Sequence, residues 1–72
     1  MPKLPRISGS KLLKILTKHF GFRTLRQKGS HVTQTNDLVF LTVPLHKELD
    51  NGTLRAILRD ANISRDEFFE YF

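Results

Sequence analysis

The chain has 72 residues, of which 12 are Lys or Arg and 7 are Asp or Glu, giving a net charge of +5. A chain of this length predicts a single domain over residues 1–72, with one small core and no room for a deep enclosed cavity. It has no cysteine, which excludes disulfide scaffolds and thiolate chemistry, and its longest apolar run is far shorter than the ~20 residues of a membrane span, so we expect a cytoplasmic protein with no membrane association.

The chain begins with a proline-containing stretch, residues 1–7, that we expect to be a flexible, extended lead-in. Apolar residues then recur at helical spacing from Ser10 to Phe20, with Ser8 or Ser10 placed to cap the start and Gly21 suited to the position after the end. The opposite side of this helix carries a basic stripe formed by Lys11, Lys14 and Lys18. Such a stripe either solubilises the helix or contacts phosphates.

Three strands are predicted next. Residues 22–27 alternate loosely, Lys28-Gly29-Ser30 reads as a tight turn, and residues 31–35 are rich in β-branched side chains. Asn36-Asp37 predicts a two-residue turn before residues 38–43, the most apolar and β-prone run in the chain, which we expect to be the most buried strand. Together these segments predict an antiparallel three-stranded meander.

Two further helices complete the predicted fold. Asp50 is a good N-cap for an apolar repeat over residues 54–61, and Ser64 with Glu67 forms a capping box for a short last helix. The final five residues hold four aromatic side chains, which we expect to fix the C-terminus onto the sheet rather than to bind a partner. The predicted class is therefore α+β, in the order α-β-β-β-α with a short extra C-terminal helix, and with both long helices on one face of the sheet.

The charges are divided unevenly along the chain. Residues 1–36 contain eight Lys or Arg and no acid, a balance of +8, whereas residues 37–72 have a balance of −3. The first half is therefore suited to meet a polyanion such as nucleic acid.

Among the three histidines, His31 has the surroundings best suited to chemistry. It follows the Lys28-Gly29-Ser30 turn, so an imidazole stands beside a cation and a glycine at the start of a strand. Because RNA supplies its own nucleophile in the 2′-OH, a histidine general base with a neighbouring cation could cleave it without a metal or other cofactor. His19 is expected to be structural, at the end of the first helix, and His46 either fixes a loop or borders a binding site.

Three blocks of sequence resemble the HicA-type (YcfA-like) toxin family. They are Gln27-Lys28-Gly29-Ser30-His31, then Leu41-Thr42-Val43-Pro44-Leu45-His46, and then the run from Gly52-Thr53-Leu54-Arg55 to Ile63-Ser64. The resemblance extends in register from about Ser8 to Phe69. Two positions depart from the family pattern: Gln34 stands where an apolar or aromatic residue is usual, and Thr35-Asn36-Asp37 replaces a basic turn.

The resemblance implies a double-stranded-RNA-binding-domain-like fold and an mRNA interferase, an endoribonuclease that cleaves mRNA without needing the ribosome. It also implies a type II toxin–antitoxin pair in which a HicB-type antitoxin covers the active site and forms a hetero-oligomer with the toxin. His31 matches the family's catalytic histidine, and Lys28, Gly29 and Ser30 match its flanking turn.

The leading hypothesis is thus an endoribonuclease in which His31 is the general base or acid and Lys28 stabilises the transition state. Contacts with RNA are expected from Lys11, Lys14, Arg26, Gly29 and Ser30. Two alternatives remain open from the sequence: a non-catalytic RNA-binding module of the same fold, and an inert relative whose cationic face only docks an acidic partner.

Overall fold

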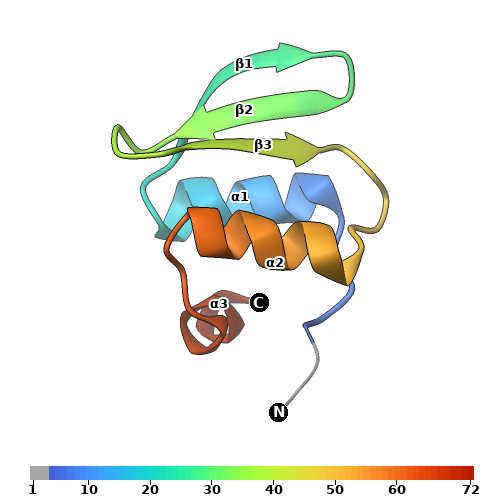
Figure 1. The fold of residues 1–72 in the computed structure, drawn as a ribbon, viewed down its shortest axis with the longest axis vertical. Helices are drawn as coiled ribbons and strands as arrows, with labels where there is room; N and C mark the ends of the chain where they lie inside the picture. The colour runs from blue at the N-terminus through green and yellow to red at the C-terminus, as the bar shows by residue number, and fades with distance from the viewer. Residues whose placement is uncertain (1–3) are drawn as a thin grey trace.

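A computed structural model describes residues 4–72 and confirms the α+β class (Figure 1). Three antiparallel strands lie in the order β1-β2-β3, and α1 and α2 run alongside each other next to β3. The elements are α1 (Gly9–His19), β1 (Arg23–Lys28), β2 (His31–Thr35), β3 (Phe40–Pro44), α2 (Asn51–Asp60) and α3 (Arg65–Tyr71).

The segment before α1 is ordered into the core, contrary to the expectation of a flexible lead-in. Leu4 and Ile7 are buried, and the Ile7 carbonyl accepts a hydrogen bond from the Leu49 N–H at 2.8 Å. Burial of these two aliphatic side chains stabilises the packed position of the segment, although its prolines favour an extended backbone. Residues 1–3, the rest of that predicted lead-in, lie outside the described residues.

Helix α1 begins and ends at the predicted signals. The Ser8 hydroxyl accepts from the Lys11 N–H at 3.1 Å, and Gly21 follows the helix with a φ of +73°, a conformation that glycine adopts without strain. Gly9 is required for a different reason: a Cβ at this position would collide with the carbonyl oxygen of Pro44. The first turn of α1 therefore packs directly against the end of β3.

Alternation along the strands separates a helix-covered face from an open face. Val32 pairs with Val43 and Gln34 with Leu41, and all four side chains are buried beneath the helices. β1 projects beyond this cover, since all six of its residues are exposed.

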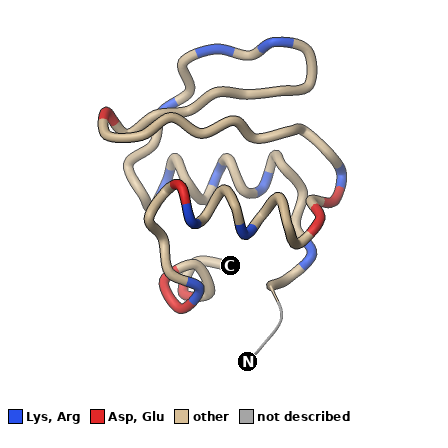
Figure 2. Tube along the Cα trace, viewed as in Figure 1, with Lys and Arg blue, Asp and Glu red and all other residues tan. Residues whose placement is uncertain are grey.

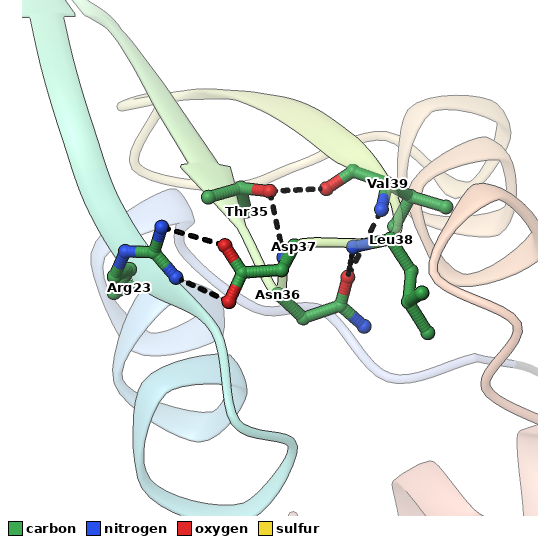
Figure 3. Close-up of polar contacts among 6 residues, drawn as sticks. All are labelled: Arg23, Thr35, Asn36, Asp37, Leu38 and Val39. Atoms are coloured by element: carbon green, nitrogen blue, oxygen red, sulfur yellow. Dashed lines mark hydrogen bonds and ion pairs between the residues drawn. The ribbon is translucent and has the colours of Figure 1, made fainter.

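The third strand is shorter and less buried than predicted. It begins at Phe40 rather than residue 38, it lies at an edge of the sheet, and Leu38 and Phe40 are 85% and 71% exposed. The predicted two-residue turn is a four-residue loop, because Asn36 Oδ1 accepts from the N–H groups of Leu38 and Val39 and holds that segment out of the ladder (Figure 3).

The C-terminal region is anchored on α1, not on the sheet. Phe68 is fully buried, whereas the Tyr71 ring stacks on His19 with centroids 4.1 Å apart. The Ser64–Glu67 capping box is present as predicted and starts α3 in the direction that brings these rings to α1. The predicted fixing of the C-terminus is thus confirmed, but its partner is a helix.

Candidate nucleic-acid interface

The hairpin between β1 and β2 brings Lys28 and His31 together. Gly29 has a φ of +60° and Ser30 has no positive φ, which is typical of a type II′ turn with glycine first. Lys28 and His31 flank this turn as directly paired residues, and such pairs carry Cβ atoms about 4.5–5.5 Å apart on the same face. The Gly29 carbonyl accepts from Gln27 Nε2 at 3.0 Å, and the Ser30 carbonyl accepts from the Leu45 N–H at 2.6 Å. The turn is therefore held on both sides.

A β-bulge at Leu25 sets which way the β1 cations point. The register shifts between Thr24 and Arg26, so that Thr24 pairs with Gln34 on the helix-covered face while Arg26 pairs with Thr33 on the open face. Without the extra residue, strict alternation would turn Arg26 to the same face as Thr24. The bulge thus brings Arg26 onto the face that carries Lys28 and His31.

The open face can be described as rows of paired residues running across the sheet. The row nearest the turn between β1 and β2 is Lys28, His31 and Pro44. The next row is Arg26, Thr33 and Thr42, and the last is Arg23, Thr35 and Phe40. Lys28, His31 and Arg26 are exposed to solvent. A histidine therefore stands with two cations on an accessible surface, where a phosphodiester could approach without entering a cavity.

An ion pair neutralises the far end of this face. Arg23 forms a bidentate contact with Asp37 at 2.9 and 2.7 Å (Figure 3), and hydrogen bonding to the guanidinium holds the pKa of Asp37 below its ordinary value. Within residues 4–72, no carboxylate lies within ion-pair distance of Arg26 or Lys28. The positive charge on β1 that no carboxylate neutralises thus lies at the end of the strand next to the Gly29-Ser30 turn.

The charge separation predicted from the sequence is also a separation in space. In Figure 2, α1 and β1 carry Lys and Arg without acidic residues, whereas Asp and Glu lie in the β2–β3 loop, around α2 and in α3. The hairpin is therefore a cationic projection from the sheet.

Two of the predicted RNA-binding residues lie away from His31. Lys11 and Lys14 are exposed on α1, which covers the opposite face of the sheet. Lys11 places Nζ 4.6 Å from the centroid of the Phe72 ring, a cation–π contact. Lys14 lines a groove between α1 and β1. The structure therefore brings together Arg26, Lys28, Gly29, Ser30 and His31, but not Lys11 or Lys14.

The sequence patterns did not predict the polar cluster that Thr17, Thr24 and Gln34 form in that groove. Gln34 is 1% exposed, and its Nε2 donates to Thr17 Oγ1 at 3.0 Å and to Thr24 Oγ1 at 3.1 Å. Strand alternation starting from the buried Val32 could have predicted that Gln34 lies on the covered face. The same alternation could not have placed Thr24, because the bulge interrupts the two-residue period of β1.

The other two histidines differ in their surroundings, and the side chain of His46 is exposed. His19 stacks on Tyr71, and the backbone carbonyl of His46 accepts from the Gly9 N–H at 3.0 Å. In the described part of the chain, no group of three His, Cys, Asp or Glu side chains is arranged to hold a metal ion. No helix among residues 4–72 has the length and apolar character needed to span a membrane.

The fold and this surface define a class: small, basic α-β-β-β-α domains that expose a cationic hairpin with a histidine beside its turn. Comparison with protein families shows which known family the chain matches. Residues 9–63 match the family described as the HicA toxin of bacterial toxin–antitoxin systems, and the chain belongs to this family. Comparisons with curated proteins and with solved structures found no significant match.

Proposed function

We propose that this toxin is an endoribonuclease that cleaves mRNA in the cytoplasm, with His31 as the catalytic base and no requirement for a metal ion or the ribosome. The observation that carries the proposal is the direct pairing of Lys28 with His31 across a turn fixed by Gly29. This pairing presents an imidazole and an ammonium group side by side on an exposed surface, in a protein of a toxin family.

In the proposed reaction His31 removes the proton of a ribose 2′-OH, and the 2′ oxygen forms a bond to the adjacent phosphorus. The bond from phosphorus to the 5′ oxygen of the next nucleotide breaks, and that oxygen takes a proton from solvent. The Lys28 ammonium stabilises the negative charge that builds up on the phosphate oxygens. The products are a 2′,3′-cyclic phosphate and a 5′-OH.

The RNA contacts on the open face would come from the turn and from β1. The backbone at Gly29 and Ser30 lets a phosphate approach closely, and Arg26 lies one row away from His31 on the same face. Arg26 would hold a neighbouring phosphate, so that the reacting nucleotide is positioned over the imidazole.

The partner in this account is a HicB-type antitoxin that covers the open face and forms a hetero-oligomer with the toxin. Phe40 is exposed on that face and Leu38 in the loop before β3. Arg26 and Lys28 are cations without a carboxylate partner among residues 4–72. An antitoxin with acidic and apolar side chains would complement both features and would block the approach of RNA to His31.

Cleavage of RNA in excess EDTA tests the proposal. The wild type is expected to cleave, and His31→Ala is expected to lower the rate by at least about 10²-fold, because general acid–base catalysis contributes on the order of 10²–10⁴-fold. The matched control is His46→Ala, an exposed loop histidine that contributes its backbone carbonyl to the fold, and it should cleave as the wild type does.

Three outcomes would contradict the proposal. Cleavage by His31→Ala at the wild-type rate would exclude the assigned base, and an absolute requirement for added metal would exclude the mechanism. RNA that is bound but left intact by the wild type would instead favour a non-catalytic RNA-binding module.

A further inference from the structure

The groove between α1 and β1 lies on the face of the sheet opposite His31. It has a volume of about 350 Å³ and is lined by Leu13, Lys14, Thr17, Lys18, Thr24 and Gln34. Its position follows from the way β1 projects beyond the helices, which leaves the helix-facing side of Thr24 open to solvent. None of the lining residues is acidic.

The directions of the hydrogen bonds in the groove leave several hydrogen-bond donors facing it. Gln34 Nε2 donates to the hydroxyl oxygens of both Thr17 and Thr24, so neither hydroxyl uses its own proton in those bonds. Both protons are therefore available to an incoming acceptor. Lys14 and Lys18 are exposed on the same wall, one helical turn apart, and add two ammonium donors.

Two hydroxyl donors and two ammonium groups with no carboxylate suit an anion with several acceptor oxygens, such as a phosphodiester. Leu13 and the alkyl stems of the two lysines give the groove apolar walls, against which a sugar or a base can lie. A nucleotide unit within a strand combines both kinds of surface.

We propose that this groove binds a backbone phosphate of the RNA substrate, at a position remote from the one that is cleaved. The inference rests on the proposed function for the identity of the substrate. It adds Thr17, Lys18 and Thr24 to the RNA-binding surface, with the buried Gln34 orienting the two threonine hydroxyls. Thr24 and Lys28 pair with Gln34 and His31, which are three residues apart on β2, about 10 Å at the usual rise of a strand. RNA would therefore pass from the open face around the exposed edge of β1 to the groove.

Binding of a labelled single-stranded RNA oligonucleotide to the His31→Ala variant tests this path without requiring cleavage. Adding Lys14→Gln and Lys18→Gln is expected to weaken binding about tenfold, because hydrogen bonds from charged groups are removed. The slope of log affinity against log salt should fall by about 0.7 for each phosphate that the protein no longer neutralises. The control, Lys47→Gln with Arg59→Gln, removes the same charge elsewhere and should bind nearly as tightly as its parent.

A second variant keeps the charge constant. Thr17→Val with Thr24→Val should weaken binding severalfold with little change in the salt slope, provided that circular dichroism shows a folded protein. Should this variant unfold, the lysine pair decides alone, since neither lysine bonds to Gln34.

The inference is overturned if the variant carrying Lys14→Gln and Lys18→Gln binds RNA as tightly as the control variant does. It is also overturned if these two substitutions weaken only the binding of the antitoxin. Its failure is distinct from failure of the proposed function. A wild type that never cleaves RNA, combined with groove-dependent binding, would refute the nuclease and retain the groove. A wild type that cleaves RNA, combined with binding that does not depend on the groove, would support the nuclease and refute the groove.

Discussion

Gln34 combines deep burial with an unsatisfied polar atom. Its Oε1 is buried and has no hydrogen-bond partner, while its Nε2 bonds to two threonines. A buried unpaired carbonyl costs about 1–3 kcal/mol, so we expect this oxygen to oppose the stabilisation that the two amide hydrogen bonds provide.

Replacement Gln34→Leu is therefore expected to stabilise the protein by about 1 kcal/mol, because it removes the unpaired oxygen and adds buried apolar surface. Thr17 and Thr24 are exposed and can bond to water instead. For a domain of this size, that gain corresponds to a rise in Tm of about 4–8 °C in thermal unfolding. The control Gln27→Leu lies on the exposed β1 and should give no such gain. A lower Tm for Gln34→Leu would show that its amide bonds outweigh its unpaired oxygen.

At the scale of elements, the β2–β3 loop is held by side chains rather than by a tight turn. Thr35 Oγ1 donates to the Val39 carbonyl at 2.8 Å and accepts from the Asp37 N–H at 3.0 Å, and Asp37 pairs with Arg23 on β1 (Figure 3). The loop thereby connects all three strands.

The Arg23–Asp37 pair predicts a pH dependence. Its hydrogen bonds lower the pKa of Asp37 below the ordinary value of 3.8, so the stabilisation is fully present above that value and is lost as the pH falls through the folded-state pKa. Asp37→Asn should therefore lower Tm at neutral pH, and the difference from wild type should shrink below about pH 4. Glu70→Gln, which removes a carboxylate without an ion pair among residues 4–72, should show no such convergence. A constant difference down to about pH 2 would contradict the assignment.

Local signals were sufficient to predict most elements. Ser8, Asp50 and the Ser64–Glu67 box cap their helices as expected, since capping depends on residues three positions apart. The predicted strand over residues 31–35 and the turn that puts Lys28 beside His31 are also found.

Features that depend on distant contacts were not predictable in the same way. Leu38 and Phe40 are apolar yet exposed, because the loop network delays the start of β3. Leu4 and Ile7 are buried by elements far along the chain. The bulge that aims Arg26 depends on the pairing of β1 with β2, which no periodicity within β1 records.

For the whole molecule, shape and charge both favour the β1–β2 hairpin as the place where a polyanion would bind. The helices cover one face of the sheet, the cationic hairpin projects from it, and the acidic residues are placed elsewhere (Figure 2). The proposed reaction needs no deep cavity, because the RNA would bring its own nucleophile and the protein would add an exposed imidazole and cations.

The chemical nature of the ends left by RNA cleavage tests this account most directly. Mass spectrometry of the products should find a 2′,3′-cyclic phosphate, or the monophosphate formed by its hydrolysis, on one fragment and a 5′-OH on the other. A substrate of the same sequence made entirely of deoxynucleotides should remain intact. Products ending in a 3′-OH and a 5′-phosphate, or cleavage of the deoxy substrate, would contradict attack by the 2′-OH and with it the role assigned to His31.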